Sequence, residues 1–164
     1  NVYKCYIRPI LESASPVWNP TDVNCTNIIE KVQRSFTKRL FFRSGLQQNL
    51  SYEDRLEILG LDTLENRRNI SDVIFLHKCI HNHFIFEKNN LYKISPLGRP
   101  LRNSHSLRIT LPFQIASSLN TFVSRHINYW NTLSQEKVSL QPETFGTFLR
   151  SLPPNTINAV SLIR

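Results

Sequence analysis

Hydrophobic side chains recur at helical spacing along most of the chain. The first of these segments, residues 2–14, predicts a short amphipathic helix. A second helix is expected over residues 22–42, because Thr21 or Asp22 can cap its N-terminus. At about 100° per residue, part of this helix forms an apolar stripe within an arc of about 80°. We expect that stripe to be buried, and it consists of Cys25, Ile29, Val32, Phe36 and Leu40.

Two further helices are predicted by their capping residues. Ser51 is followed by Asp54 at the spacing of a capping box, and Gly60 stands where a left-handed residue ends a helix. Asp62 and Thr63 repeat the capping pattern, so a longer helix is expected over residues 63–84. Its apolar residues lie on several faces, which predicts a central helix. They are Ile70, Val73, Ile74, Ile80 and Phe84 on one stripe, with Phe75, Leu76 and Cys79 elsewhere.

Residues 87–113 differ from the helical segments around them. Proline and glycine interrupt this stretch, and after Glu87 it carries basic residues but no acidic one. We expect an extended basic loop here, with a short strand at Leu107–Leu111. The basic residues that recur in it are Arg99, Arg102, His105 and Arg108.

Helical periodicity returns in the C-terminal part, at Leu119, Phe122, Val123, Ile127 and Trp130, and a last short helix follows Pro142. We expect Trp18 and Trp130 to be core anchors, with stacking on nucleic-acid bases as the minor alternative. The predicted fold class is therefore all-α, an irregular helical bundle of about five to six helices with a basic, proline-containing loop in the middle. We expect one folded domain with an N-terminal helical part at 1–86, the loop at 87–113 and a C-terminal helical part at 114–164.

The charge balance points to a polyanionic partner. The chain has 164 residues, with 20 Lys and Arg against 12 Asp and Glu, a net charge of +8 and a pI near 9.8. Nucleic acid is the default partner of so basic a chain, although many small basic proteins bind nothing anionic in particular. Five basic residues and no acidic residue occur from Lys31 to Arg43.

Lys31, Arg34 and Lys38 form a row on the helix expected over 22–42. They fall within an arc of about 60°, opposite the apolar stripe, and span about 10 Å along the axis. We predict that this row, together with Arg39, contacts phosphates; the alternative is a solvated basic face. Arg67 and Arg68 are further predicted contacts. For these two arginines, the favoured alternative is an ion pair with Glu65 or Asp72 in place of a phosphate contact.

No catalytic site is visible. Polymerase chemistry needs paired carboxylates for two metal ions, and the only adjacent acids, Glu53 and Asp54, are explained by helix capping. Isolated glycines cannot form a nucleotide-binding loop. His77 and His81 have the i, i+4 spacing of metal ligands, but no glutamate lies between them in an HExxH pattern. We therefore expect buried, hydrogen-bonded histidines, no metal or other cofactor in this chain, and no small-molecule substrate.

Targeting features are few. The three cysteines, Cys5, Cys25 and Cys79, are widely spaced, which favours reduced thiols in an intracellular protein, nuclear or cytoplasmic. No apolar run is long enough to span a membrane, and no signal peptide is apparent, so neither a membrane location nor secretion is expected. The chain contains no methionine and begins with Asn1, so we expect it to be part of a longer protein.

Short motifs along the chain resemble those of one family. In order they are Arg8–Glu12 (RPILE), Ser15–Trp18 (SPVW), Glu30–Arg34 (EKVQR), Phe36–Arg39 (FTKR), Ser51–Leu56 (SYEDRL), Leu59–Leu61 (LGL), Leu64–Arg68 (LENRR), Trp130-Asn131-x-Leu133 and Phe148-Leu149. This series resembles the segment that follows the polymerase core in jockey-like and CR1-like non-LTR (LINE) retrotransposon reverse transcriptases. The chain departs from that pattern at Ser13, where the family often has tyrosine, and at Ser134, where it has proline.

The resemblance implies a function without catalysis in this chain. The parent protein would be an RNA-directed DNA polymerase whose catalytic residues and divalent metal belong to the absent core. This chain would be the thumb and downstream helical region, expected to bind template–primer duplex or the element's own RNA. One alternative is a structural domain that packs on the polymerase core or on a protein partner, with an apolar surface around Phe41 and Phe42. Another is a degraded element with no independent function.

Overall fold

Helices joined by short turns make up most of the described chain, with one small sheet. The computed structural model describes residues 2–45, 49–84, 91–95, 105–112, 121–154 and 156–157. The predicted all-α class is confirmed, apart from a two-stranded sheet. The elements are η1 Tyr3–Ile7, α1 Arg8–Glu12, α2 Ser15–Trp18, α3 Val23–Arg43, α4 Tyr52–Leu59, α5 Leu64–Ile80, β1 Lys93–Ile94, β2 Ile109–Thr110, α7 Phe122–Thr132, α8 Gln135–Val138 and α9 Pro142–Arg150.

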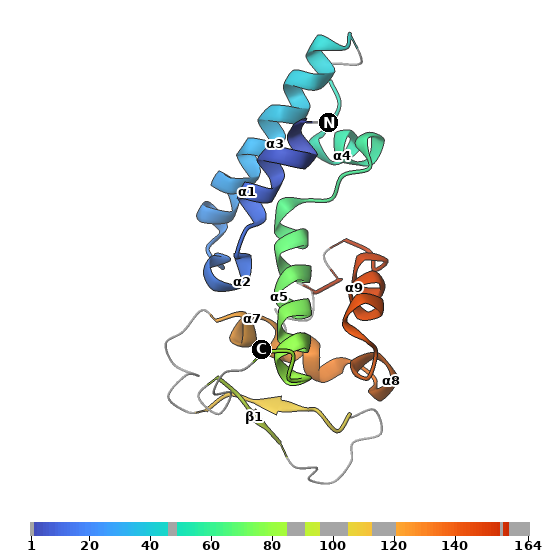
Figure 1. Ribbon diagram of the computed structural model, residues 1–164. Coiled ribbons are helices and arrows are strands. Elements are labelled where there is room, and N and C mark those ends of the chain that lie inside the picture. Colours follow the sequence, from blue (N-terminus) through green and yellow to red (C-terminus); the bar gives the residue numbers. More distant parts are fainter. Residues whose placement is uncertain are drawn as a thin grey trace.

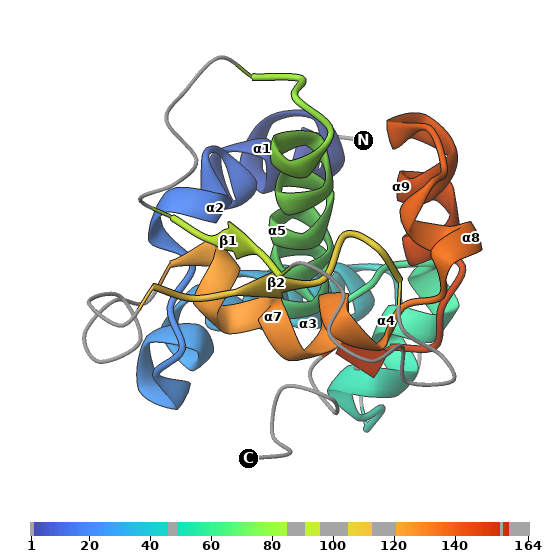
Figure 2. The same cartoon turned by 90° about the horizontal axis from the view of Figure 1, so that it is seen from below.

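The α5 helix lies at the centre of the molecule, as its apolar pattern predicts. It contacts α1, α2 and α3 from the N-terminal part of the sequence and α7 and α9 from the C-terminal part. Figure 2 shows it surrounded by these elements. Leu64, Val73 and Leu76 on it are fully buried. The helix ends at Ile80, earlier than the predicted 84, because the chain turns through Asn82 in the left-handed conformation, with φ 62.

The N-terminal segment is not the single α-helix expected over residues 2–14. Its first part, η1, is a π-helix, followed by the short helix α1. Pro9 at the start of α1 has no backbone N–H, so the α-helical hydrogen bond from this position cannot form. The wider helical turns fall just before this proline, and Arg8 N–H donates to the Tyr3 carbonyl.

Trp130 anchors the C-terminal core, as predicted. It is fully buried, and its indole N–H donates to the Leu107 carbonyl at 2.9 Å. The neighbouring Asn131 side chain accepts from Ile109 N–H and donates to Ile109 C=O, both at 3.0 Å. These bonds hold β2 against α7. The predicted strand at Leu107–Leu111 is present at Ile109–Thr110, where it pairs with Lys93–Ile94 in antiparallel register.

The α3 helix and the sheet lie at opposite ends of the molecule (Figure 1). The C-terminal end of α3 projects beyond α4, while β1 and β2 lie next to α7 at the other end. In the parts of the chain that the structure describes, no helix is long and apolar enough to cross a membrane. Leu119 and two residues of the basic loop, Arg99 and Arg102, lie outside the described residues.

Candidate nucleic-acid interface

The α3 helix begins where its capping residue predicts. The Asp22 carboxylate accepts a hydrogen bond from Cys25 N–H at 2.9 Å, and this backbone bond lowers the pKa of Asp22. The helix then runs for 21 residues to Arg43, which corresponds to a length of about 31 Å. It is long enough to present several turns of surface to one partner.

The buried face of α3 is not the one that its apolar residues predict. Its buried side chains are Glu30, Gln33, Thr37 and Phe41. In the expected stripe, Val32 is 41% and Leu40 39% exposed, Cys25 is exposed, and Ile29 and Phe36 are only partly buried. The prediction that this stripe is buried is therefore wrong, and most of the side chains that replace it are polar.

Gln33 shows why a polar face is buried here. Its side-chain oxygen accepts from the Tyr3 hydroxyl at 2.6 Å. Its side-chain nitrogen donates to the Tyr52 hydroxyl and to the Asp62 carbonyl, both at 2.9 Å. Both N–H groups of the amide and one lone pair of its oxygen are used by groups far away in the sequence, so its burial leaves little unsatisfied.

Glu30, one turn before Gln33 on α3, belongs to the same polar face. Its carboxylate accepts from the N–H groups of Leu64 and Glu65 at 3.2 and 3.3 Å, at the N-terminus of α5, and from the Tyr52 hydroxyl. A carboxylate at this position also matches the helix dipole. Burial and the bond to Glu30 raise the pKa of Tyr52. We call Glu30, Gln33 and Thr37 the polar face.

With the polar face inward, the predicted phosphate contacts of α3 face solvent. Lys31, Arg34, Lys38 and Arg39 are all exposed. The Arg34 guanidinium lies 5.0 Å from the centroid of the Tyr52 ring, a cation–π distance that restricts its direction. We call Lys31, Arg34 and Lys38 the cationic row. Exposure is what a phosphate contact requires, while the contact itself stays a prediction.

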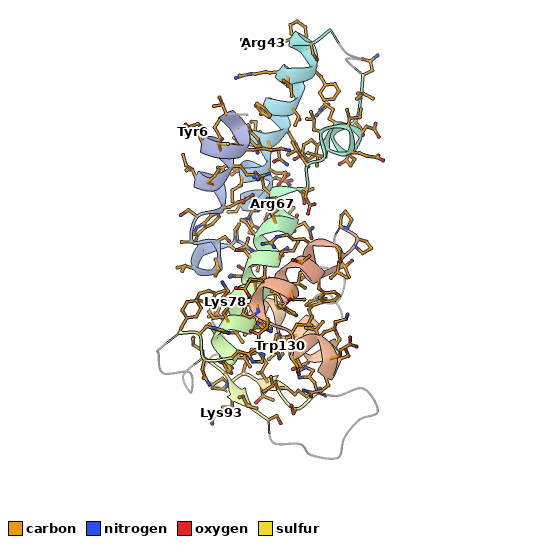
Figure 3. The ribbon with its side chains drawn as sticks, turned by 45° about the vertical axis from the view of Figure 1, so that its right-hand side comes forward. Tyr6, Arg43, Arg67, Lys78, Lys93 and Trp130 are labelled. Carbon is orange, nitrogen blue, oxygen red and sulfur yellow. The ribbon has the colours of Figure 1, made fainter. Side chains whose placement is uncertain are left out.

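A groove at the C-terminal end of α3 brings two of the predicted phosphate contacts together with Phe42 and with Arg43, which the sequence analysis did not single out. Its volume is about 500 Å³, and Lys38, Arg39, Phe42 and Arg43 line it. Arg43 marks this end of the molecule in Figure 3. Phe42 is 68% exposed, whereas Phe41 is buried, so the expected apolar surface around both phenylalanines is wrong for Phe41. We call these four residues the basic groove.

Arg67 binds a carboxylate rather than standing free on the surface. Its Nε and Nη2 donate to the two oxygens of Glu12 on α1, the second at 2.8 Å, and this raises the pKa of Arg67. Pairing with Glu65 or Asp72 was the favoured alternative for this residue; an ion pair is present, and the partner that the structure shows is Glu12. The pair holds α1 on α5, so Arg67 has a structural role in the fold.

Arg68 is wrong as a predicted nucleic-acid contact. Its exposed fraction is 0%, its guanidinium lies 5.9 Å from the Trp18 ring centroid, and its Nε donates to the Asn19 side-chain oxygen at 3.0 Å. Trp18 itself is 40% exposed, less buried than a core anchor. Because α5 is covered on several sides, a basic residue on it can point inward.

Asp72 on α5 joins three parts of the chain. Its Oδ2 accepts from Asn19 Nδ2 at 2.9 Å and from Arg125 Nε at 2.8 Å, and His126 Nε2 lies at 3.2 Å. Arg125 also donates to the Pro16 carbonyl at 2.9 Å. The ion pair of Asp72 is therefore with α7, and not with the neighbouring arginines of its own helix.

His77 on α5 and His81, which follows the end of this helix, differ in burial and in hydrogen bonding. His77 is buried and stacks on Phe145 with ring centroids 4.2 Å apart, but neither of its ring nitrogens has a hydrogen-bond partner among the described residues, so the expected hydrogen bond is wrong for His77. Burial and, to a smaller extent, the nearby His81 lower the pKa of His77 to about 4. His81 donates to the Val138 carbonyl at 2.7 Å, a hydrogen bond of the expected kind. Over the described ranges, no three metal-ligating side chains are grouped to hold an ion.

Comparisons of the chain with protein-family models, with curated proteins and with solved structures gave no match. The resemblance to retrotransposon reverse transcriptases therefore stays a prediction.

Proposed function

We propose that this chain is the non-catalytic helical region downstream of the polymerase core in a non-LTR retrotransposon reverse transcriptase. In this proposal α3 binds template–primer duplex or the element's RNA through the phosphate backbone. The observation that carries it is the exposed cationic row, Lys31, Arg34 and Lys38, on a helix of 21 residues. The proposed family rests on the series of short sequence motifs described above.

The spacing of the cationic row suits a phosphate backbone. Lys31 and Lys38 are two helical turns apart, which is about 10 Å along the axis. Such contacts neutralise phosphates and release counterions, so binding weakens steeply with salt. Because phosphate contacts carry no base information, we expect little sequence preference.

The test is the affinity of the purified chain for a labelled RNA–DNA duplex. The triple variant K31E/R34E/K38E should bind at least about tenfold more weakly, because three phosphate contacts become repulsive. The matched control is K93E/R108E/R150E, which makes the same charge change at exposed residues. Lys93 lies at the end of the molecule opposite Arg43 (Figure 3). An equal loss in both variants, or none in the first, would contradict the proposal.

A second function, packing on the polymerase core or on a protein partner, has its own observation. Large apolar side chains of the N-terminal helices are exposed, among them Val2, Tyr6, Ile10 and Val17. Exposed apolar groups in such number are typical of interaction surfaces. If this function is the correct one, the chain should self-associate in sedimentation experiments, Ile10→Gln with Val17→Gln should relieve it, and the duplex should not bind.

A further inference from the structure

The basic groove contains an aromatic side chain that the fold does not use. Phe42 is 68% exposed and makes no ring contact with another described residue, whereas the adjacent Phe41 is buried. Lys38, Arg39 and Arg43 line the same groove. Exposing a phenylalanine forgoes the free energy of burying its ring. Packing within the described chain gives no reason for its position.

Helix geometry places Phe42 in line with the cationic row. At about 100° per residue, Lys31, Lys38 and Phe42 fall within an arc of about 40°. Phe42 lies one turn beyond Lys38, about 6 Å further along the axis. Arg39 and Arg43, also one turn apart, follow the row on one flank. A strand that follows the row toward this end of α3 would reach the ring next.

We propose that the basic groove binds an unpaired nucleobase, which stacks on Phe42 while Lys38, Arg39 and Arg43 contact the phosphates beside it. This inference rests on the proposed function and adds a substrate feature to it, a junction between duplex and single strand. A nucleobase has a flat π face, and each nucleotide brings one negative charge. Aromatic side chains set among cations are the usual means of holding single strands.

Charge favours a nucleic acid over a peptide in this groove. No acidic residue occurs between Lys31 and Tyr52, so the sequence around the groove offers no carboxylate to neutralise its cations. The cationic row continues that charge at intervals of about one helical turn, which matches a polymer with evenly spaced charges. An acidic peptide with an aromatic residue would meet the same groove without using the row.

The experiment compares a blunt RNA–DNA duplex with the same duplex carrying a single-stranded extension at its 3′ or its 5′ end. The first unpaired position holds 2-aminopurine, whose fluorescence changes when the base stacks. One of the two extensions should tighten binding about tenfold and change the fluorescence. Phe42→Leu should lose both effects and Phe42→Trp should keep them. Both variants should bind the blunt duplex as the unsubstituted chain does.

Tyr6→Leu is the matched control, because Tyr6 is 69% exposed on η1, outside the groove. It should keep the gain from the extension. The inference is overturned if neither extension adds affinity, or if the gain persists in Phe42→Leu. Failure of the proposed function is distinct: blunt-duplex binding would then be unaffected by K31E/R34E/K38E. Phe42-dependent binding of an acidic peptide, with no gain from either extension, would assign the groove to a protein partner and overturn the inference.

Discussion

Gln33 and His77 show how single buried polar residues contribute to this fold. Gln33 bonds two tyrosine hydroxyls and the Asp62 carbonyl. Gln33→Leu should therefore lower the free energy of unfolding by about 1–3 kcal/mol, because the two hydroxyls and the carbonyl lose this hydrogen-bond partner where water does not replace it. Urea denaturation measures this. Asn27→Leu, at an exposed position of the same helix, should change it by less than about 0.5 kcal/mol; equal effects would contradict the role of the polar face.

The pKa of His77, lowered to about 4 from 6.5, makes stability depend on pH. The unfolded chain binds a proton here at a higher pH than the folded one does. The contribution of His77 to the free energy of unfolding is therefore fully present above pH 6.5. This contribution, about 1–3 kcal/mol, is lost as the pH falls toward 4. In His77→Gln this part of the pH dependence should disappear, measured as the slope of unfolding free energy against pH. An unchanged slope would show that His77 does not titrate this way.

At the scale of the element, the sequence predicts where α3 lies better than which way it faces. Its predicted range of 22–42 compares with Val23–Arg43, and Asp22 caps it. Periodicity identifies the buried face only where the partners are apolar. The partners of the polar face are Tyr3, Tyr52 and the N-terminus of α5, and no local pattern reveals them. Lys38, Arg39 and Phe42 were named from the sequence, but their grouping with Arg43 in the basic groove was missed for the same reason, since it becomes visible only once the buried face is known.

The orientation of α3 is itself testable at two adjacent residues. Phe41 is buried, while Leu40 in the predicted stripe is 39% exposed. Phe41→Ala should lower the unfolding free energy by about 3–5 kcal/mol. Leu40→Gln should lower it by less than about 1 kcal/mol, because this side chain keeps contact with water. Thermal or urea unfolding of the two variants would show the reverse order if the apolar stripe were the buried face.

At the scale of the whole molecule, Asp72 links the N-terminal helices to the C-terminal part. Its carboxylate meets Asn19 near α2 and Arg125 and His126 on α7. Asp72→Ala should lower stability by about 3–5 kcal/mol, because it leaves a buried guanidinium without its charge partner. Glu12→Ala, which breaks the more exposed pair with Arg67, should lower it by about 1 kcal/mol or less. Similar losses in calorimetry would argue against a central role for Asp72.

The central claim is that the cationic row of α3 holds nucleic acid by its phosphates. The most direct measurement is the slope of the logarithm of duplex affinity against the logarithm of salt concentration. With Lys31, Arg34 and Lys38 each neutralising one phosphate, K31E/R34E/K38E should reduce this slope by roughly 3, at about 0.9 per contact. The K93E/R108E/R150E control should leave it nearly unchanged. A slope that is the same in all three proteins would contradict the claim.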